Sequence, residues 1–295
     1  MGDTNFRIQV VLSLQTPYIE KLEQIGRRNR SISRGRLFCR PTQRNAPCYR
    51  VVTTRVNHVS VIPTIPEYHG FSFVYQNNST MVSLEDSWKE ATEGLDEVVC
   101  DTWFTRIQEV YSEEKRTYHN LDSLREKLNH YYEIKNNLKN PQAVLLAIFF
   151  QNFEYEPKAM DDEDKNLEHF NAFADEAEIP PDAELKEETC ALLKVAATHS
   201  TEAHKVGGAF GGEDAHYFLD LDMAVLGSSP GNYAEYRERI RGEYYFLSEP
   251  MYTALRLKVL QNFLQIPNIF ATMEFRDKLE EQARQNIQAE VEMLS

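Results

Sequence analysis

From about Ser83 to the C-terminus, the sequence carries apolar residues at the three- and four-residue spacings of amphipathic α-helices. The segment begins with SLEDSWKEATEGL, where Ser83 stands three residues before Asp86 in a pattern that resembles a capping box. It closes with apolar residues four apart, from Phe275 to Val291, which form one stripe along an otherwise polar helix. Because such stripes are buried only when helices pack together, residues 83–295 predict a mainly α-helical bundle.

The first 82 residues show a different pattern. The segments FRIQVVLSL, YRVVTTRV and HVSVIPTI are alternating or β-branched runs, and FSFVYQ is a fourth strand candidate. Clusters of Gly, Asn and Pro, which favour turns, separate these runs. We therefore expect two domains, a small β-rich module over residues 1–82 and the helical domain over residues 83–295.

The net charge of −14 conceals two parts of opposite sign. Residues 1–66 contain 11 Lys and Arg against 3 Asp and Glu, whereas the remainder contains 21 against 43. No acidic residue lies between Glu23 and Glu67. This stretch contains nine arginines, namely Arg27, Arg28, Arg30, Arg34, Arg36, Arg40, Arg44, Arg50 and Arg55.

The arginine-rich segment from Arg27 to Arg55 has two interpretations. It is either a solvated loop or arm that docks on acidic protein surfaces, those of its own helical part included, or an arm that grips RNA phosphates. Only Phe38 and Tyr49 interleave with the arginines, so stacking on bases has little support. We favour the first interpretation over RNA binding.

The rest of the composition indicates a globular intracellular protein. Hydrophobic residues make up 42% of the chain, which excludes wholesale disorder. The longest apolar run, residues 143–150, is far shorter than the roughly 20 residues that cross a membrane. The four cysteines lack the paired spacing of a zinc site, and the N-terminus lacks the pattern of a secretory leader. We expect free thiols in a reducing compartment, cytoplasmic or mitochondrial.

The apolar run from Ala143 to Phe150 ends abruptly at two adjacent amide side chains, Gln151 and Asn152. The run predicts the buried end of a helix. Two amides at that point are unusual, because buried polar groups need hydrogen-bond partners. Their position raises the question of what the pair does at the edge of a core.

Four stretches of the helical segment attract notice together, namely RTYHNLDSL (116–124), AIFFQNFEYEPKAMDDEDKN (147–166), LLKVAATHS (192–200) and YFLDLDMAVLG (217–227). Each alone is weak, since a lone histidine in a helix is more often structural than a ligand. In order and spacing, together with YAEYRERIRGEY and VLQNFLQIPNIFAT, they resemble the predicted metal-dependent phosphohydrolases of the HD superfamily, in a bacterial-type subfamily with a Tyr-His-Asn-Leu motif. The resemblance runs from about Ser83 to the C-terminus.

The resemblance implies a mainly α, HD-domain-like helical bundle with a site for a divalent cation. In the family, a His of the first motif, an adjacent His-Asp pair and a distant Asp bind the ion, which polarises phosphate and activates water. Here His119 matches the first His, and Asp222, or less well Asp220, matches the last Asp. The His-Asp pair is replaced by Gln151 and Asn152.

These departures weaken the implied ligand set. An amide oxygen can bind a hard cation but brings no charge, and Gln is no substitute for imidazole toward a transition metal. Ser123 also stands where the subfamily usually has a further His. The possible accessory positions are Asn120, Asp161, Glu163, His199 and Asp220.

We therefore expect no metal and no cofactor, and we assign no catalytic residue. The favoured hypothesis is a degenerate, non-catalytic HD-family protein that acts as a structural or regulatory subunit of a larger assembly. The alternative is a divergent phosphohydrolase that uses Mn, Fe, Mg or Zn to act on a nucleotide or small phosphate ester. Protein partners are expected, RNA binding through residues 27–55 is not favoured, and no association with a membrane is expected.

Overall fold

The computed structural model describes residues 82–159, 162–198 and 200–295. The predicted β-rich module and the arginine-rich segment lie outside these residues. Within the described part, the secondary structure is helical and includes no strand, which confirms the all-α character expected for this segment. The α-helices are α2 (Leu84–Ala91), α3 (Glu97–Tyr111), α4 (Leu121–Ile134), α5 (Pro141–Phe150), α6 (Asp162–Glu176), α7 (Glu184–Ala196), α8 (Glu202–Lys205), α9 (Asp214–Met223), α10 (Pro230–Glu243), α11 (Glu249–Gln265) and α12 (Met273–Leu294).

Two short 3₁₀ turns, η1 (Lys135–Asn137) and η2 (Ala224–Gly227), continue α4 and α9. Among the helices that the structure describes, none has the length and apolarity that crossing a membrane requires. Two of the four cysteines fall in the same part of the chain, and both Cys100 and Cys190 are free thiols there, as expected.

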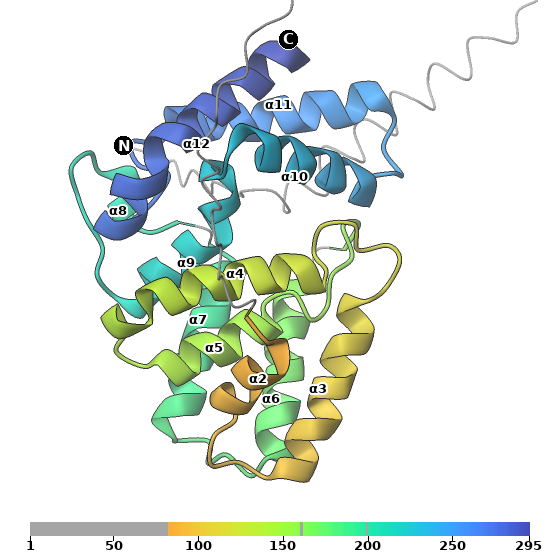
Figure 1. Cartoon of the computed structure of the whole chain (residues 1–295), viewed down its shortest axis with the longest axis vertical. Helices are drawn as coiled ribbons and strands as arrows, with labels where there is room; N and C mark the ends of the chain where they lie inside the picture. Colours follow the sequence, from red (N-terminus) through yellow and green to blue (C-terminus); the bar gives the residue numbers. More distant parts are fainter. Residues whose placement is uncertain (1–81, 160–161, 199) are drawn as a thin grey trace, which may run out of the picture. The chain divides into compact units, whose positions relative to one another are not determined.

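Helix α5 is the centre of one group of helices, because it packs against α2, α4, α6, α7 and α9 (Figure 1). Every residue from Ala143 to Phe150 is buried, so the helix is apolar on all sides. Asn140 caps its N-terminus by accepting a hydrogen bond from the amide of Ala143, at 3.1 Å. Aromatic side chains surround its C-terminal end, where Trp88 packs edge-on against Phe149. The apolar run is therefore the core helix that the sequence predicts.

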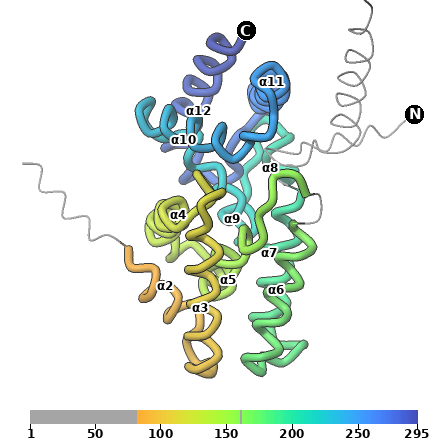
Figure 2. Tube along the Cα trace, turned by 90° about the vertical axis from the view of Figure 1, so that its right-hand side faces the viewer, coloured from red at the N-terminus to blue at the C-terminus, as the bar shows by residue number. Residues whose placement is uncertain are grey.

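Helix α3 packs against α2 and α6, whereas the long helices α10, α11 and α12 lie together beyond α9 in both views (Figure 1 and Figure 2). Helix α12 packs against α11 and η2. Its predicted stripe is confirmed, since the residues from Phe275 to Ile287 at this spacing are buried and Val291 is partly buried. A buried ion pair between Arg256 and Glu290, at 2.8 Å, ties α11 to α12.

The start of the described helical segment follows the capping prediction. Ser83 is the N-cap of α2, and its hydroxyl accepts a hydrogen bond from the amide of Asp86 at 3.1 Å. The leucines of the YFLDLDMAVLG stretch are also buried, namely Leu219, Leu221 and Leu226. Local caps and apolar spacing thus account for both ends of the helical segment and for the helix that carries the two aspartates.

Candidate functional site

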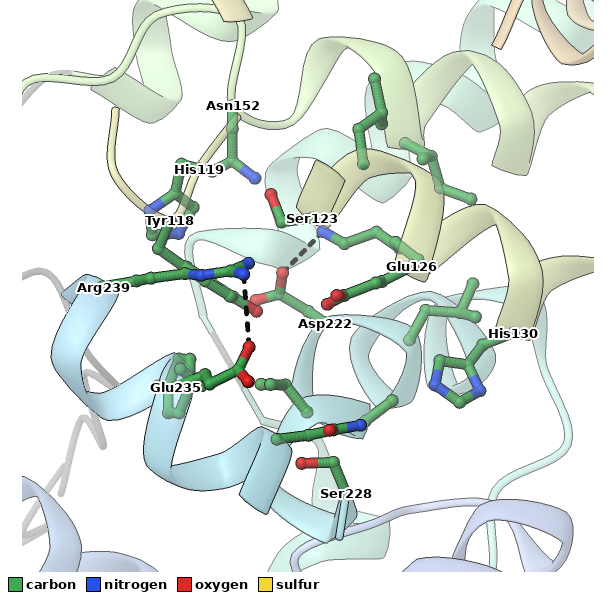
Figure 3. A pocket seen from close by; sticks show the side chains of 18 of the residues that line it. Tyr118, His119, Ser123, Glu126, His130, Asn152, Asp222, Ser228, Glu235 and Arg239 are labelled. Atoms are coloured by element: carbon green, nitrogen blue, oxygen red, sulfur yellow. Dashed lines mark hydrogen bonds and ion pairs between the residues drawn. The ribbon is translucent and has the colours of Figure 1, made fainter. Parts of the chain in front are cut away.

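A cavity of about 230 Å³ lies between α4, the residues that follow α5, α9 with η2, and α10 (Figure 3). Figure 3 shows Asp222 and Arg239 directed toward its middle. The polar and charged residues of its wall include His119, Ser123, Lys127, Asn152, Asp222 and Arg239. Segments far apart in the sequence therefore contribute to one polar site at the edge of the core.

His119 lies in the turn before α4, and its ring is held on several sides. Its Nδ1 is 2.8 Å from Oε2 of Glu243 on α10, and the ring of Tyr155 packs on it with centroids 4.1 Å apart. The carboxylate of Glu243 accepts the N–H of Nδ1, so Nε2 is the ring nitrogen that this bond leaves over. His119 lines the cavity, and its side chain is 12% exposed. Because Nδ1 is engaged by Glu243, Nε2 is the nitrogen that the ring can offer to a ligand.

Glu243 is a fully buried carboxylate that receives hydrogen bonds from four donors. Oε1 accepts from the backbone amides of Tyr118 and His119, at 2.8 and 2.7 Å. Oε2 accepts from the hydroxyl of Tyr155, at 2.8 Å, and from the imidazole. Burial opposes ionisation of Glu243, but the charge and hydrogen bonds of His119 outweigh burial and hold the pKa of this carboxyl below its ordinary value. Burial also raises the pKa of Tyr155, so its hydroxyl remains a donor.

Two buried side chains fasten the loop that follows α5. The guanidinium of Arg116 donates to the carbonyl oxygens of Asn152 and Phe153, at 2.6 and 2.7 Å. From α6, the amide of Asn166 donates to the carbonyl oxygen of Gln151 at 2.7 Å. These bonds satisfy carbonyls that the end of α5 leaves without helical partners. They also fix the backbone from which the two amide side chains project.

Lys127 of α4 supplies a cation to the same wall. Its ammonium Nζ lies 2.7 Å from Oδ1 of Asp222 and 2.8 Å from Oε1 of Gln151. The lysine side chain is 11% exposed and that of Asp222 is 29% exposed. Leu124 and Leu128, three positions before and one after it, are buried, so the lysine stem starts at the edge of the buried face of α4. The carboxylate and one of the two amides thus share one ammonium group.

Arg239 and Glu235, one turn apart on α10, also line the cavity and form an ion pair at 3.4 Å. Their side chains are 37% and 69% exposed, so this pair is much more open to water than the one at Lys127. Ser228 lines the cavity as well, and its buried hydroxyl oxygen has no hydrogen-bond partner within the described part of the protein. The cavity therefore changes from a buried polar floor to a solvated rim.

The two aspartates of α9 face different surroundings, because residues two apart point about 200° from each other around a helix. Asp222 lines the cavity, whereas Asp220 is fully buried away from its wall. The carboxylate of Asp220 accepts hydrogen bonds from the amides of Ala271 and Thr272, both at 2.8 Å. Since Thr272 is the N-cap of α12, Asp220 fastens the start of that helix.

Two of the other accessory candidates lie within the described residues, and neither joins the cavity as a ligand. Asn120 is the N-cap of α4, and its side-chain oxygen accepts from the amides of Asp122 and Ser123, which explains an asparagine directly before this helix. Glu163 lies on α6 and is not among the residues of the cavity wall. Asp161 and His199 lie outside the described residues.

Several residues of the site were missed by reasoning from the sequence, Glu243 and Lys127 among them. Glu243 lies in YAEYRERIRGEY, which the family resemblance includes, but nothing local distinguishes it from the other glutamates of that helix. Lys127 gives no local signal either, since a lysine on an amphipathic helix is normally solvated. Both gain their roles from partners that are distant in the sequence.

The described residues of the cavity do not supply the ligands that a transition-metal ion requires. Within the described residues, no group of three or more His, Cys, Asp or Glu side chains is arranged to hold a metal ion. Of His119, Gln151, Asn152 and Asp222, only His119 and Asp222 are of these types, and Asp222 is already bonded to an ammonium group. Protein sites for transition metals ordinarily have at least three imidazole, thiolate or carboxylate ligands, so these residues do not fit such an ion.

Comparison of the chain with protein-family models, curated proteins and solved structures gave no match.

Proposed function

We propose that this chain is a non-catalytic HD-like protein that acts as a structural or regulatory subunit of a larger assembly. The observation that carries the proposal is the donor set at the four positions that the family motifs assign to the metal. The set consists of one imidazole, two neutral amides and one carboxylate, from His119, Gln151, Asn152 and Asp222. It is too poor in charge and imidazole to hold the ion on which hydrolysis in that family depends.

The relation to the HD superfamily is part of the proposal. It is supported by the meeting of motif residues from three separate segments at one cavity, where His119, Asn152 and Asp222 line the wall. Gln151 contacts the same wall through the ammonium of Lys127.

The role in an assembly is supported by the charge of the chain. The described helical part is strongly acidic, whereas residues 1–66 have 11 Lys and Arg against 3 Asp and Glu. A basic segment appended to an acidic helical domain can attach the domain to an acidic protein partner. A site that has lost its chemistry is then free to serve stability and assembly.

A hydrolysis assay tests the absence of catalysis. The full chain would be incubated with Mn²⁺, Fe²⁺, Mg²⁺ or Zn²⁺ and with p-nitrophenyl phosphate or nucleoside phosphates, beside His119→Ala. We expect only background hydrolysis, equal in both proteins. Metal-dependent hydrolysis that disappears in His119→Ala would overturn the proposal.

The alternative, a divergent metal-dependent phosphohydrolase, is favoured by one observation, the bond between His119 and Glu243. Metal-binding histidines usually donate their second ring N–H to a carboxylate or carbonyl, and this pair has that form. The same assay separates the two functions, because only the alternative expects turnover that depends on both the ion and the histidine.

A further inference from the structure

Lys127 places a positive charge between two oxygen atoms, one from Asp222 and one from Gln151. Its Nζ makes contacts of 2.7 Å with Asp222 and 2.8 Å with Gln151, within the range of strong charge-assisted hydrogen bonds. The two oxygen atoms come from α9 and from the end of α5, so the ammonium joins two elements that the sequence separates widely. With 11% of its side chain exposed, this lysine is part of the site and not of the solvated surface.

An ammonium group and a divalent cation compete for the same kind of partner. Both attract carboxylate and amide oxygens, but metal–oxygen bonds are about 2.0–2.6 Å long, much shorter than the contacts of Lys127. A metal ion bound to these same two oxygen atoms would lie within a few ångströms of the ammonium, so the two cations compete for the position. Because the lysine side chain keeps the ammonium close to the cavity, its positive charge would also repel an incoming metal ion.

We propose that the ammonium of Lys127 is a built-in cation. It binds the oxygen atoms of Asp222 and Gln151 in place of a divalent metal ion and so prevents such an ion from binding in this cavity. The inference rests on the proposed function, because it explains how the position assigned to the ion is filled once turnover is lost. It adds a specific consequence. Restoring the family ligands alone does not restore a metal site, and the lysine must be removed as well.

The chain offers a matched control for the loss of a lysine. Lys186 is 11% exposed, like Lys127, and forms one ion pair with Asp175 at 2.6 Å. It lies on α7 and is not part of the cavity wall. Its replacement removes an equally covered ammonium without touching the site.

The test is a Mn²⁺ titration by isothermal calorimetry, with elemental analysis of the dialysed full-length proteins. The set comprises the natural protein, the double variant Gln151→His with Asn152→Asp, and that double variant with Lys127→Met, with Lys127→Arg or with Lys186→Met. A parallel Lys127→Gln version covers the case in which Lys127→Met does not fold, and circular dichroism checks the helix content of each protein.

We expect the double variant with Lys127→Met, or with Lys127→Gln, to bind Mn²⁺ roughly ten- to hundredfold more tightly than the double variant alone. The versions with Lys127→Arg or Lys186→Met should behave like the double variant. If the double variant binds Mn²⁺ with equal affinity with and without Lys127, the proposal that Lys127 is a built-in cation is wrong. The proposal is also wrong if a folded double variant without Lys127 does not bind Mn²⁺. Neither result touches the proposed function, which fails only if the natural protein hydrolyses phosphate esters with a bound ion.

Discussion

Two polar clusters border the same cavity, and they differ in how deeply their charges are covered. Around His119, the carboxylate of Glu243 is fully buried and receives four hydrogen bonds, two of them from the backbone. Around Lys127, the carboxylate of Asp222 is 29% exposed and shares its cation with the side chain of Gln151. The first cluster is built into the fold, whereas the second consists of side chains at the cavity wall.

The difference indicates which parts of such a site can change. A buried carboxylate with four donors cannot be replaced without leaving several of them unsatisfied, and this makes the support of the imidazole costly to lose. Side chains at a wall that borders a cavity can exchange an imidazole for an amide, or an ion for an ammonium, at smaller cost. The support of His119 is thus fixed by the fold, beside wall positions whose side chains can be exchanged at smaller cost.

The largest effect is expected from Glu243→Leu. It removes the acceptor of two backbone amides, one hydroxyl and one imidazole, so the free energy of unfolding should fall by about 3–5 kcal/mol. Urea denaturation of the full chain measures this loss. Glu243→Gln keeps the shape and one acceptor oxygen, which can still receive two of the four hydrogen bonds, so it should lose clearly less. Equal losses in the two variants would show that packing, and not the hydrogen bonds, gives Glu243 its importance.

A smaller effect is expected from Lys127→Met, which leaves the carboxylate of Asp222 without its ammonium at a partly covered wall. The free energy of unfolding should fall by about 1–2 kcal/mol. Lys186→Met, whose partner Asp175 is 73% exposed, should cost less than about 1 kcal/mol by the same urea measurement. A cost at Lys127 no greater than at Lys186 would mean that the cavity pair is no stronger than a surface pair.

Replacement of Gln151 by Ala removes one of the two oxygen contacts of the ammonium and keeps its charge partner. We expect a loss of about 0.5–1.5 kcal/mol in the free energy of unfolding, as for one ordinary hydrogen bond. The double variant Gln151→Ala with Lys127→Met should lose less free energy of unfolding than the sum of the losses in the two single variants, because both changes remove the same contact. Strict additivity in this double-mutant cycle would contradict the bond between them.

The smallest difference is expected in how the free energy of unfolding depends on pH in the natural protein and in Glu243→Gln. Glu243 has a pKa below its ordinary value of 4.5 in the folded protein, so it contributes stability above that pH and loses it as the pH falls through the folded pKa. The natural protein should therefore lose more free energy of unfolding below pH 4.5 than Glu243→Gln does. Denaturation series at several pH values compare the two proteins, and parallel curves would refute a stabilising ionised Glu243.

Part of this arrangement could be predicted from the sequence. The helices and their caps follow from local patterns, as Ser83 and the stripe of α12 illustrate. The motifs indicated His119 and Asp222 as neighbours of the amide pair. They left Asp220 open, and only the packing of α9 against the start of α12 assigns that residue to a structural contact.

The rest depends on contacts that no local pattern encodes. Lys127 has the sequence environment of a solvated helical lysine, and its role comes from oxygen atoms carried by α9 and by the end of α5. Glu243 likewise resembles the other glutamates of α10 until Tyr118, His119 and Tyr155 are brought to it. Tertiary packing, and not residue type, decides which charged side chains form the site.

If the cation of this cavity belongs to the chain itself, the natural protein should hold no metal ion there. Elemental analysis of the full chain, produced and purified with Mn, Fe and Zn supplied, measures this. We expect that no metal is retained in stoichiometric amount, and that His119→Ala leaves the metal content unchanged. About one ion per chain, lost in His119→Ala, would contradict this expectation.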